Sequence, residues 1–176
     1  HGNLQHSLKQ TIKVWHYTTK SVTLTWAPHT HVYGLVCGIL VPLYHGTLAI
    51  IMPPAAFINK PLVWLAAISK YRVSHSGCPN FGYDMCVSHI KDCDLTSINL
   101  KHWQVAINGG DIVQHQSLMA FANKFSACGF ELNSFCSAYG MSELSGAIAV
   151  TSFELEPKLF SPAVGRPIVS SGSLLN

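Results

Sequence analysis

Residues 47–54 have the sequence Thr47-Leu48-Ala49-Ile50-Ile51-Met52-Pro53-Pro54, an apolar run that two prolines end. A strand that is apolar on both faces is typical of a parallel sheet covered by helices. Further short runs with strand character lie at 20–27, 73–76, 103–108 and 133–137. Because segments with helical periodicity separate them, the chain is predicted to be α/β, with a mostly parallel sheet and right-handed crossovers, flanked by helices.

Helices are expected between these strands, where apolar residues recur every three or four positions. The expected ranges are 3–15, 34–44, 62–71, 84–89 and 118–125. The second helix should be buried between layers, kinked at Pro42 and followed by Gly46. Residues 59–61 should cap the third helix, and Gly129 should end the last. Residues 77–83 are rich in Gly and Pro, which predicts an irregular loop.

The composition favours one heavily buried unit. Of the 176 residues, 48% are hydrophobic and 11% are charged, which suits a single α/β core. We expect residues 1–153 to form this core and residues 154–176 to be an exit segment. Because the chain starts without Met and stops inside a possible strand, we expect it to be a single fragment of a longer protein.

Charge and cysteine usage argue against several classes of protein. The net charge of +3 comes from scattered Lys and Arg residues, whereas a nucleic-acid groove needs clustered ones. The apolar run 32–44 is shorter than the roughly 20 residues of a transmembrane segment. The six Cys residues form no Cys-x-x-Cys pair, and His29 and His31 have no matching ligands nearby, which argues against zinc. We therefore expect reduced thiols in a cytoplasmic protein.

Polar and glycine-rich loops follow four of the predicted strands, and a parallel sheet brings these loops to one edge. The four loops are Trp26-Ala27-Pro28-His29-Thr30-His31-Val32-Tyr33-Gly34-Leu35, Ser74-His75-Ser76-Gly77-Cys78-Pro79-Asn80-Phe81-Gly82-Tyr83-Asp84, Asn108-Gly109-Gly110-Asp111 and Tyr139-Gly140-Met141-Ser142-Glu143. The last places a ring, a hydroxyl and a carboxylate at a strand end, where open sheets bind ligands. Such a group could hold a nucleotide and its metal ion.

Taken in order, these loops resemble those of the adenylate-forming enzymes, and most of all the fatty acyl-AMP ligases and acyl-CoA synthetases. The resemblance spans nearly the whole chain, from His1-Gly2-Asn3-Leu4 to Val164-Gly165-Arg166-Pro167. It implies the central part of the large N-terminal domain of such an enzyme. It also implies ATP-dependent activation of a fatty acid to an acyl adenylate, with Mg²⁺, ATP and a fatty acid as partners and CoA or an acyl carrier protein as acceptor.

The resemblance also implies roles for individual residues. His31 would orient the reacting groups, Ser142 would donate to the α-phosphate, and Glu143 would bind the magnesium ion. The nucleotide would contact Asn108, Gly109, Gly110, Asp111, Tyr139, Gly140 and Met141. The acyl chain would contact Gly34, Ser76, Gly77, Pro79, Asn80, Phe81 and Tyr83. Simpler interpretations stay open: His31 as an ordinary loop histidine, Asp111 as a helix cap, and Phe81 and Tyr83 as core residues.

The chain departs from the family at several positions. Val32-Tyr33 stands where the family has Asp-Met, Ile112 where it has Pro, Asp111 where Glu is common, and His75 where a small residue is common. The family's phosphate loop, ribose-binding aspartate and catalytic lysine lie outside the chain. We therefore expect the isolated fragment to be inactive.

Other functions stay open. Within the family these are an acyl-CoA ligase, an amino-acid-activating domain and a catalytically inactive binding module. Residues 76–79 are small and uncharged, which favours an apolar substrate over an amino acid. A serine hydrolase is disfavoured, because Leu144 replaces the second glycine that a nucleophile elbow around Ser142 needs.

Overall fold

The computed structural model describes residues 1–144, 146–150, 159–160, 168–169 and 173–174. Its strands are β1 (Val22–Thr25), β2 (Leu48–Ile51), β3 (His75–Gly77), β4 (Val105–Gly109), β5 (Phe135–Met141), β6 (Gly146–Val150), β7 (Leu159–Phe160), β8 (Ile168–Val169) and β9 (Ser173–Leu174). Seven strands form one sheet in the order β2-β1-β3-β4-β5-β6-β9, and β7 pairs with β8 separately. The strands from β1 to β5 pair in parallel, whereas β6 is antiparallel to both of its neighbours. The predicted α/β class with a mostly parallel sheet is confirmed.

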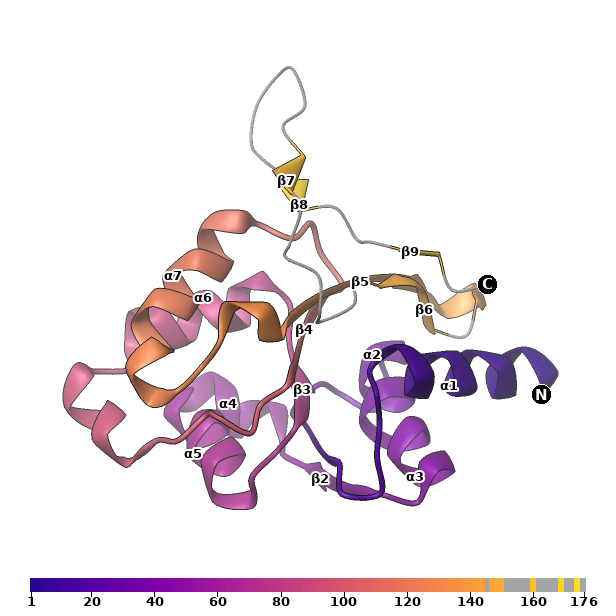
Figure 1. Ribbon diagram of the computed structural model, residues 1–176, viewed down its shortest axis with the longest axis horizontal. Coiled ribbons are helices and arrows are strands. Elements are labelled where there is room, and N and C mark those ends of the chain that lie inside the picture. The colour runs from indigo at the N-terminus through magenta and orange to yellow at the C-terminus, as the bar shows by residue number, and fades with distance from the viewer. Residues whose placement is uncertain (145, 151–158, 161–167, 170–172, 175–176) are drawn as a thin grey trace.

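Helices cover both faces of this sheet. They are α1 (Gly2–Val14), α2 (Val32–Leu35), α3 (Val41–His45), α4 (Pro54–Asn59), α5 (Leu62–Tyr71), α6 (Asn80–His89) and α7 (His115–Phe125), with a π-helical segment η1 (Val36–Leu40) between α2 and α3. Single 3-10 segments are η2 (Asp92–Ser97), η3 (Ser126–Cys128), η4 (Leu132–Ser134) and η5 (Ser142–Leu144). In Figure 1, α4 to α7 lie on one side of the strands and α1 to α3 on the other.

Two hydrophobic cores follow from this layering, because side chains alternate between the faces of a strand. On β4, Ala106 packs into the core beneath α4 to α7, whereas Val105 and Ile107 pack into the core beneath α1 to α3. The larger core is rich in rings that meet edge to face. Trp64 and Trp103, for example, have centroids 5.1 Å apart at 76°, a favourable geometry for aromatic pairs.

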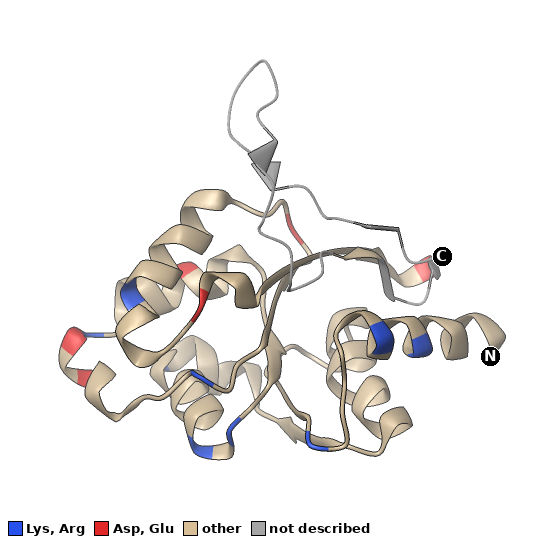
Figure 2. Ribbon diagram, viewed as in Figure 1, with Lys and Arg blue, Asp and Glu red and all other residues tan. Residues whose placement is uncertain are grey.

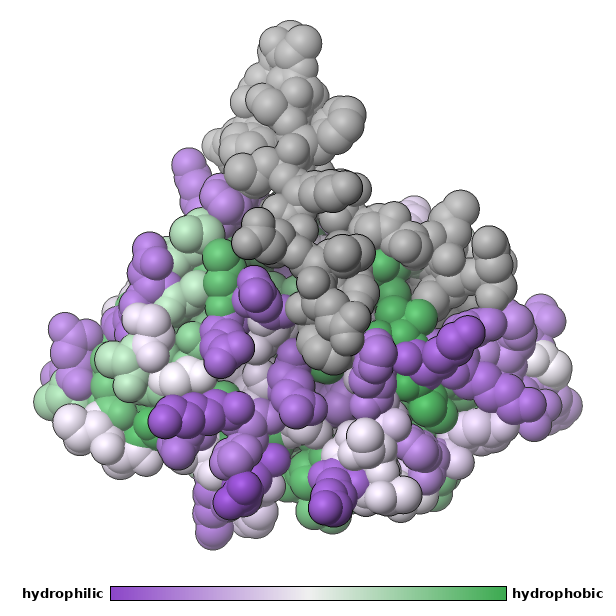
Figure 3. All heavy atoms as spheres, viewed as in Figure 1, coloured by the Kyte–Doolittle hydropathy of each residue, from purple (hydrophilic) through white to green (hydrophobic). Residues whose placement is uncertain are grey.

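The strand that predicts the fold class lies at an edge of the sheet. β2 pairs with β1 alone among the described strands, and Leu48 and Ile51 are 56% and 59% exposed. Figure 3 shows green, hydrophobic residues at the surface in the lower part of the view, where β2 lies in Figure 1. The strand and its parallel pairing are confirmed, but its burial on both faces is wrong, because strand order places it at the edge.

Several helices differ from the predicted ranges. The predicted helix 34–44 becomes α2, η1 and α3, and Leu43 is exposed rather than buried between layers. The helical segment continues through Pro42 as α3 and changes from π-helical to α-helical at Val41, while Gly46 takes the left-handed conformation at φ 78°. Helix α4 is an addition to the predicted set. Helix α6 begins at Asn80 because Pro79 starts it, so residues 80–83 are helical and not an irregular loop.

The predictions from cysteine content, charge and hydropathy can be compared with the described residues. All six cysteines are free thiols, as expected. Figure 2 shows the basic and acidic residues of the described chain scattered, without a basic stripe on this face. None of the helices in the described part combines the length and apolar character that crossing a bilayer requires. Most of the predicted exit segment, including residues 164–167, lies outside the described residues.

Candidate active site

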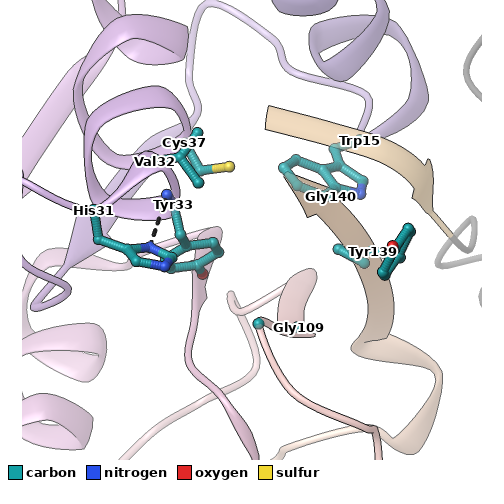
Figure 4. Close-up of a pocket in the computed structure, with 10 residues that line it drawn as sticks. Trp15, His31, Val32, Tyr33, Cys37, Gly109, Tyr139 and Gly140 are labelled. Carbon is teal, nitrogen blue, oxygen red and sulfur yellow. Dashed lines mark hydrogen bonds between the residues drawn. The ribbon is translucent and has the colours of Figure 1, made fainter. Parts of the chain in front are cut away.

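A cavity of about 50 Å³ opens at the carboxyl edge of the sheet. In Figure 4, His31 and Tyr33 lie on one side of it, Trp15 and Tyr139 on the other, and Gly109 below. Its lining residues are Trp15, His31, Val32, Tyr33, Cys37, Gly109, Gly110, Ala138, Tyr139 and Gly140. Three of the four predicted loops therefore meet here, at the edge where open parallel sheets bind ligands.

His31 occupies the N-cap of α2, and its Nδ1 accepts a hydrogen bond of 3.1 Å from the Tyr33 backbone N–H. A nitrogen that accepts this bond carries no proton, so the neutral ring has its proton on Nε2. His31 is exposed, and Nε2–H can donate to a ligand at the cavity. The residue thus combines a structural role as a cap with a donor that a phosphate or carboxylate oxygen could use.

The turn after β4 presents backbone to the cavity. A Cβ at Gly109 would lie 2.3 Å from the carbonyl oxygen of Ala138, and Gly110 has φ +85°. A side chain at position 109 would therefore clash with the backbone, and a side chain at position 110 would strain it. Asp111 is exposed, and its Oδ1 accepts from the Ile112 N–H at 2.7 Å. It stabilises its own turn and does not cap α7, whose N-cap is Gln114.

Two buried amides hold this turn from behind. Asn108 is 1% exposed, and its Nδ2 donates to Asn80 Oδ1 at 2.9 Å. Asn80 Oδ1 also accepts from the Gln114 N–H at 3.1 Å, and its Nδ2 donates to the Ile112 carbonyl. Within the described chain, Asn108 Oδ1 is buried without a partner. Both side chains therefore lie beneath the turn, and neither lines the cavity.

The end of β5 forms the opposite wall. Tyr139 is 56% exposed and borders the cavity, and the pairing with β6 is irregular between Tyr139 and Gly140. Ser142 and Glu143 follow Met141 in the 3-10 turn η5, and both are exposed. Neither lines the cavity, and both follow its lining residues Tyr139 and Gly140 along the chain.

Comparison with known proteins identifies the family of the chain. The family model described as "AMP-binding enzyme" matches residues 1–172 of the chain. The chain belongs to this family. It is 41% identical over 158 residues to a medium-chain-fatty-acid–[acyl-carrier-protein] ligase of Teredinibacter turnerae, covering 90% of this chain and 25% of that protein. A ligase of the same description from Moorena producens is 38% identical over 143 residues, covering 81% and 24%.

A solved structure shows the same fold. The crystal structure of a fatty acyl-adenylate ligase from L. pneumophila, in complex with acyl adenylate and pyrophosphate, superposes with a TM-score of 0.94 at 30% identity. The match covers 99% of this chain and 34% of that one. The chain thus has the fold of an adenylate-forming enzyme and spans about a quarter of the length of the curated relatives it matches.

The residues that the resemblance assigned to the acyl chain are mostly buried in structural contacts. Tyr83 is 0% exposed, and its hydroxyl donates to the Ile107 carbonyl at 2.8 Å. Ser76 Oγ donates to a backbone carbonyl at 2.7 Å and accepts from the Trp64 indole N–H at 2.9 Å. Phe81 is 49% exposed and meets Trp26 edge to face. Tyr83 is therefore a core residue, as its simpler interpretation allowed.

Asn80 lies beneath the turn after β4, and of the three remaining residues assigned to the acyl chain, Gly34 and Gly77 permit close backbone packing. A Cβ at Gly34 would lie 2.3 Å from the Pro28 carbonyl oxygen, and a Cβ at Gly77 would lie 2.1 Å from the Ile107 carbonyl oxygen. Pro79 is the N-cap of α6 and lies beneath Gly110, where a Cβ would meet its Cγ at 3.7 Å. These residues shape the surroundings of the cavity, and their contact with an acyl chain stays a prediction.

The structure adds three residues to the cavity that the motifs did not contain: Trp15, Cys37 and Ala138. Tyr33 and Cys37 are four positions apart, so one face of the helix carries both, and this spacing was visible in the sequence. Burial raises the pKa of the Cys37 thiol to about 12, which keeps it uncharged. Trp15 comes from the end of α1, and only the fold brings it to this edge.

Proposed function

We propose that the full-length protein activates a fatty acid with ATP, forming an acyl adenylate and releasing pyrophosphate. The observation that carries this proposal is an apolar cavity, free of carboxylates among its lining residues, whose wall includes a glycine turn and the exposed ring of Tyr139. The relatives named as fatty-acid ligases and the neighbour solved with acyl adenylate support it.

The lining also bears on the choice of substrate. An amino-acid substrate brings an ammonium group, which in an apolar site needs an acidic partner. The residues around the cavity include no Asp or Glu. This favours a fatty acid over the amino-acid-activating alternative. Because the first relatives are named as acyl-carrier-protein ligases, we propose a carrier protein as the acceptor in preference to CoA.

The chemical step joins two anions. A carboxylate oxygen of the fatty acid attacks the α-phosphorus of ATP, the bond to the β-phosphate oxygen breaks, and pyrophosphate leaves with that electron pair. Repulsion between the reactants must be offset by positioned donors and cations. The Nε2–H of His31 and the Ser142 hydroxyl would donate to these oxygens, while Gly109, Gly110 and Tyr139 would hold the adenine.

A magnesium ion fits the acidic group that is present. In the described part of the chain, no three His, Cys, Asp or Glu side chains gather as a metal site. Mg²⁺ is commonly bound by one or two carboxylates together with substrate phosphates, so a full protein cage is not needed. Glu143 would be the protein ligand, and the ion would neutralise charge on the phosphates when bound.

The experiment measures fatty-acid-dependent exchange of pyrophosphate into ATP by the full-length protein. We expect Glu143→Gln to lower the exchange rate by roughly 10²–10³-fold, the usual loss when one electrostatic stabiliser is removed. Its thermal stability should not change, because the side chain is exposed. The matched control is Glu131→Gln, which removes an exposed carboxylate before the other end of β5 and should leave exchange intact.

Other results would point elsewhere. ATP binding without exchange with any fatty acid would favour a catalytically inactive module, which the apolar Val32 at the cavity would fit. Equal losses in Glu143→Gln and Glu131→Gln would contradict the assigned role of Glu143. The isolated 176-residue chain should show no exchange, since it spans about a quarter of its relatives.

A further inference from the structure

Two cavities in the chain share a wall. The first is the cavity of about 50 Å³ at the candidate active site. The second, of about 10 Å³, lies between the α2–η1 segment and strands β1, β3 and β4. Tyr33 and Cys37 line both cavities and therefore separate them. The inner cavity has room for about one water-sized group, so it is too small for a chain while this wall stands.

The inner cavity is lined by polar residues whose groups are already bonded within the protein. Thr23 Oγ1 lies 3.1 Å from the Tyr17 hydroxyl, and Thr25 Oγ1 accepts a backbone N–H at 3.1 Å. Ser76 Oγ donates to a backbone carbonyl, and both ring nitrogens of His75 have partners. An apolar guest in this space would therefore leave no hydrogen bond broken. The inner cavity suits methylene groups, provided that the wall is opened.

The backbone that carries the wall packs closely against β1 and the loop that follows it. A Cβ at Gly34 would lie 2.3 Å from the Pro28 carbonyl oxygen, and a Cβ at Gly38 would lie 2.4 Å from Thr25 Cγ2. The helical segment thus packs against β1 and its following loop with no space to move closer. The space between the two cavities is therefore filled by the side chains of Tyr33 and Cys37.

Both wall residues are uncharged. Burial raises the pKa of the Tyr33 phenol well above its usual value, and it raises the pKa of the Cys37 thiol to about 12. Tyr33 also packs against the core beneath α1 to α3. A neutral, packed surface suits contact with the methyl end of an acyl chain. It offers no opposite charge to pair with a charged group.

We propose that the side chain of Tyr33, together with Cys37, closes the acyl site at the end of the outer cavity and sets the upper limit of acyl chain length. This inference rests on the proposed activation of fatty acids. It adds that the enzyme prefers shorter acids to long ones. Tyr33 would be a specificity-determining residue and would take no part in the reaction itself.

The test measures kcat/KM for acyl-adenylate formation by the full-length enzyme with saturated fatty acids from hexanoate to palmitate. Tyr33→Ala joins the two cavities, so the preferred chain should become longer. The gain should be roughly fourfold in kcat/KM for each additional methylene that becomes buried. Tyr33→Phe keeps the ring and should keep the wild-type preference. Cys37→Ala removes only the sulfur from the same wall and should shift the preference in the same direction by less.

The outcomes separate the two proposals. An active Tyr33→Ala variant with the wild-type preference would overturn the inference while leaving the proposed function intact. If Tyr33→Ala is inactive, an unchanged preference in Cys37→Ala overturns the inference, and a shift toward longer acids supports it. A wild-type enzyme that forms no adenylate with any fatty acid would overturn the proposed function and this inference with it.

Discussion

At the scale of single residues, His75 shows how burial fixes a charge state. It is 1% exposed on β3, its Nε2 lies 2.9 Å from the Trp15 carbonyl oxygen, and its Nδ1 lies 2.8 Å from Ser74 Oγ. Because a carbonyl only accepts, Nε2 carries the proton and Nδ1 accepts. The ring stacks on Tyr17 at 3.9 Å. Burial lowers the pKa of His75 from 6.5 to about 4, and the neighbouring His45 adds to this.

This shift predicts a pH-dependent stability. In the unfolded chain His75 takes up a proton near its usual pKa, whereas the folded state resists protonation down to about pH 4. The free energy of unfolding should therefore fall as the pH drops from about 6.5 to about 4, by up to about 3 kcal/mol from this residue. His75→Gln cannot titrate and should reduce this loss, as measured by urea unfolding at several pH values.

The control for this prediction is His6→Gln, which replaces an exposed histidine on α1. It should leave the pH dependence of unfolding as in the wild type. If both variants show the wild-type loss between pH 6.5 and pH 4, the acid sensitivity arises elsewhere. The amide of Gln can still donate to the Trp15 carbonyl, so the loss of that hydrogen bond is not the quantity measured.

The residues of the site could be predicted only in part. His31, Gly109 and Tyr139 line the cavity, and each lies in a loop whose motif singled it out. Trp15 lines the same cavity but lies in a helix whose pattern reports only an amphipathic face. Asn80 belongs to a predicted loop and yet is buried beneath the turn after β4. The sequence therefore indicates which loops meet. Whether a residue of such a loop faces the cavity or the protein interior depends on how its side chain packs.

At the scale of elements, the segment α2–η1–α3 owes its shape to Pro42. Pro42 has no N–H for the carbonyl four residues earlier, so regular α-helical bonding fails there and the π-helical turn Val36–Leu40 results. Such single π-turns often occur at functional sites. Here the turn contains Cys37, and Gly38 next to it contacts β1 closely.

Close packing of this element on β1 gives a prediction. In Gly38→Ala the new Cβ would lie 2.4 Å from Thr25 Cγ2, so the segment must move away from the sheet. We expect a loss of about 1–3 kcal/mol in the free energy of unfolding, the usual effect of overpacking. Denaturant unfolding of the single variant and of Gly38→Ala/Thr25→Ser would test it.

The double variant is the decisive comparison. Serine at position 25 lacks Cγ2 but keeps the oxygen that accepts the Ala27 N–H, so part of the lost stability should return. Thr25→Ser alone should cost less than Gly38→Ala. If the two changes were simply additive, the clash with Thr25 would not be the cause of the loss.

The other helices and strands show which elements the periodicity of apolar residues can predict. The strands and most helices could be predicted because their apolar patterns extend over several residues. Helix α4 was not predicted, because it has only six residues and starts at a proline pair that also ends the preceding strand. The start of α6 was not predicted, because the Gly and Pro residues in 77–82 suggest a loop. In the structure Pro79 is the N-cap and Asn80 is the first helical residue.

At the scale of the whole molecule, the order of strands decides which apolar residues are buried. The sequence of β2 is as apolar as that of a central strand, and periodicity cannot tell an edge from a centre. The structure places β2 at the edge, with Leu43 and Tyr44 of α3 and Leu48 and Ile51 of β2 exposed. An exposed, apolar edge strand is a template for pairing with another chain.

We therefore expect the 176-residue chain to associate with itself through β2. Ile51→Lys places a charge on the exposed edge, where it should oppose strand pairing and reduce association in sedimentation velocity. Stability should change by no more than about 0.5 kcal/mol, as for most exposed substitutions. Ile112→Lys is the matched control, because Ile112 is equally apolar and exposed but lies in the turn after β4. An equal reduction by both variants would attribute association to general hydrophobicity, whereas a reduction by Ile51→Lys alone identifies the strand edge as the contact.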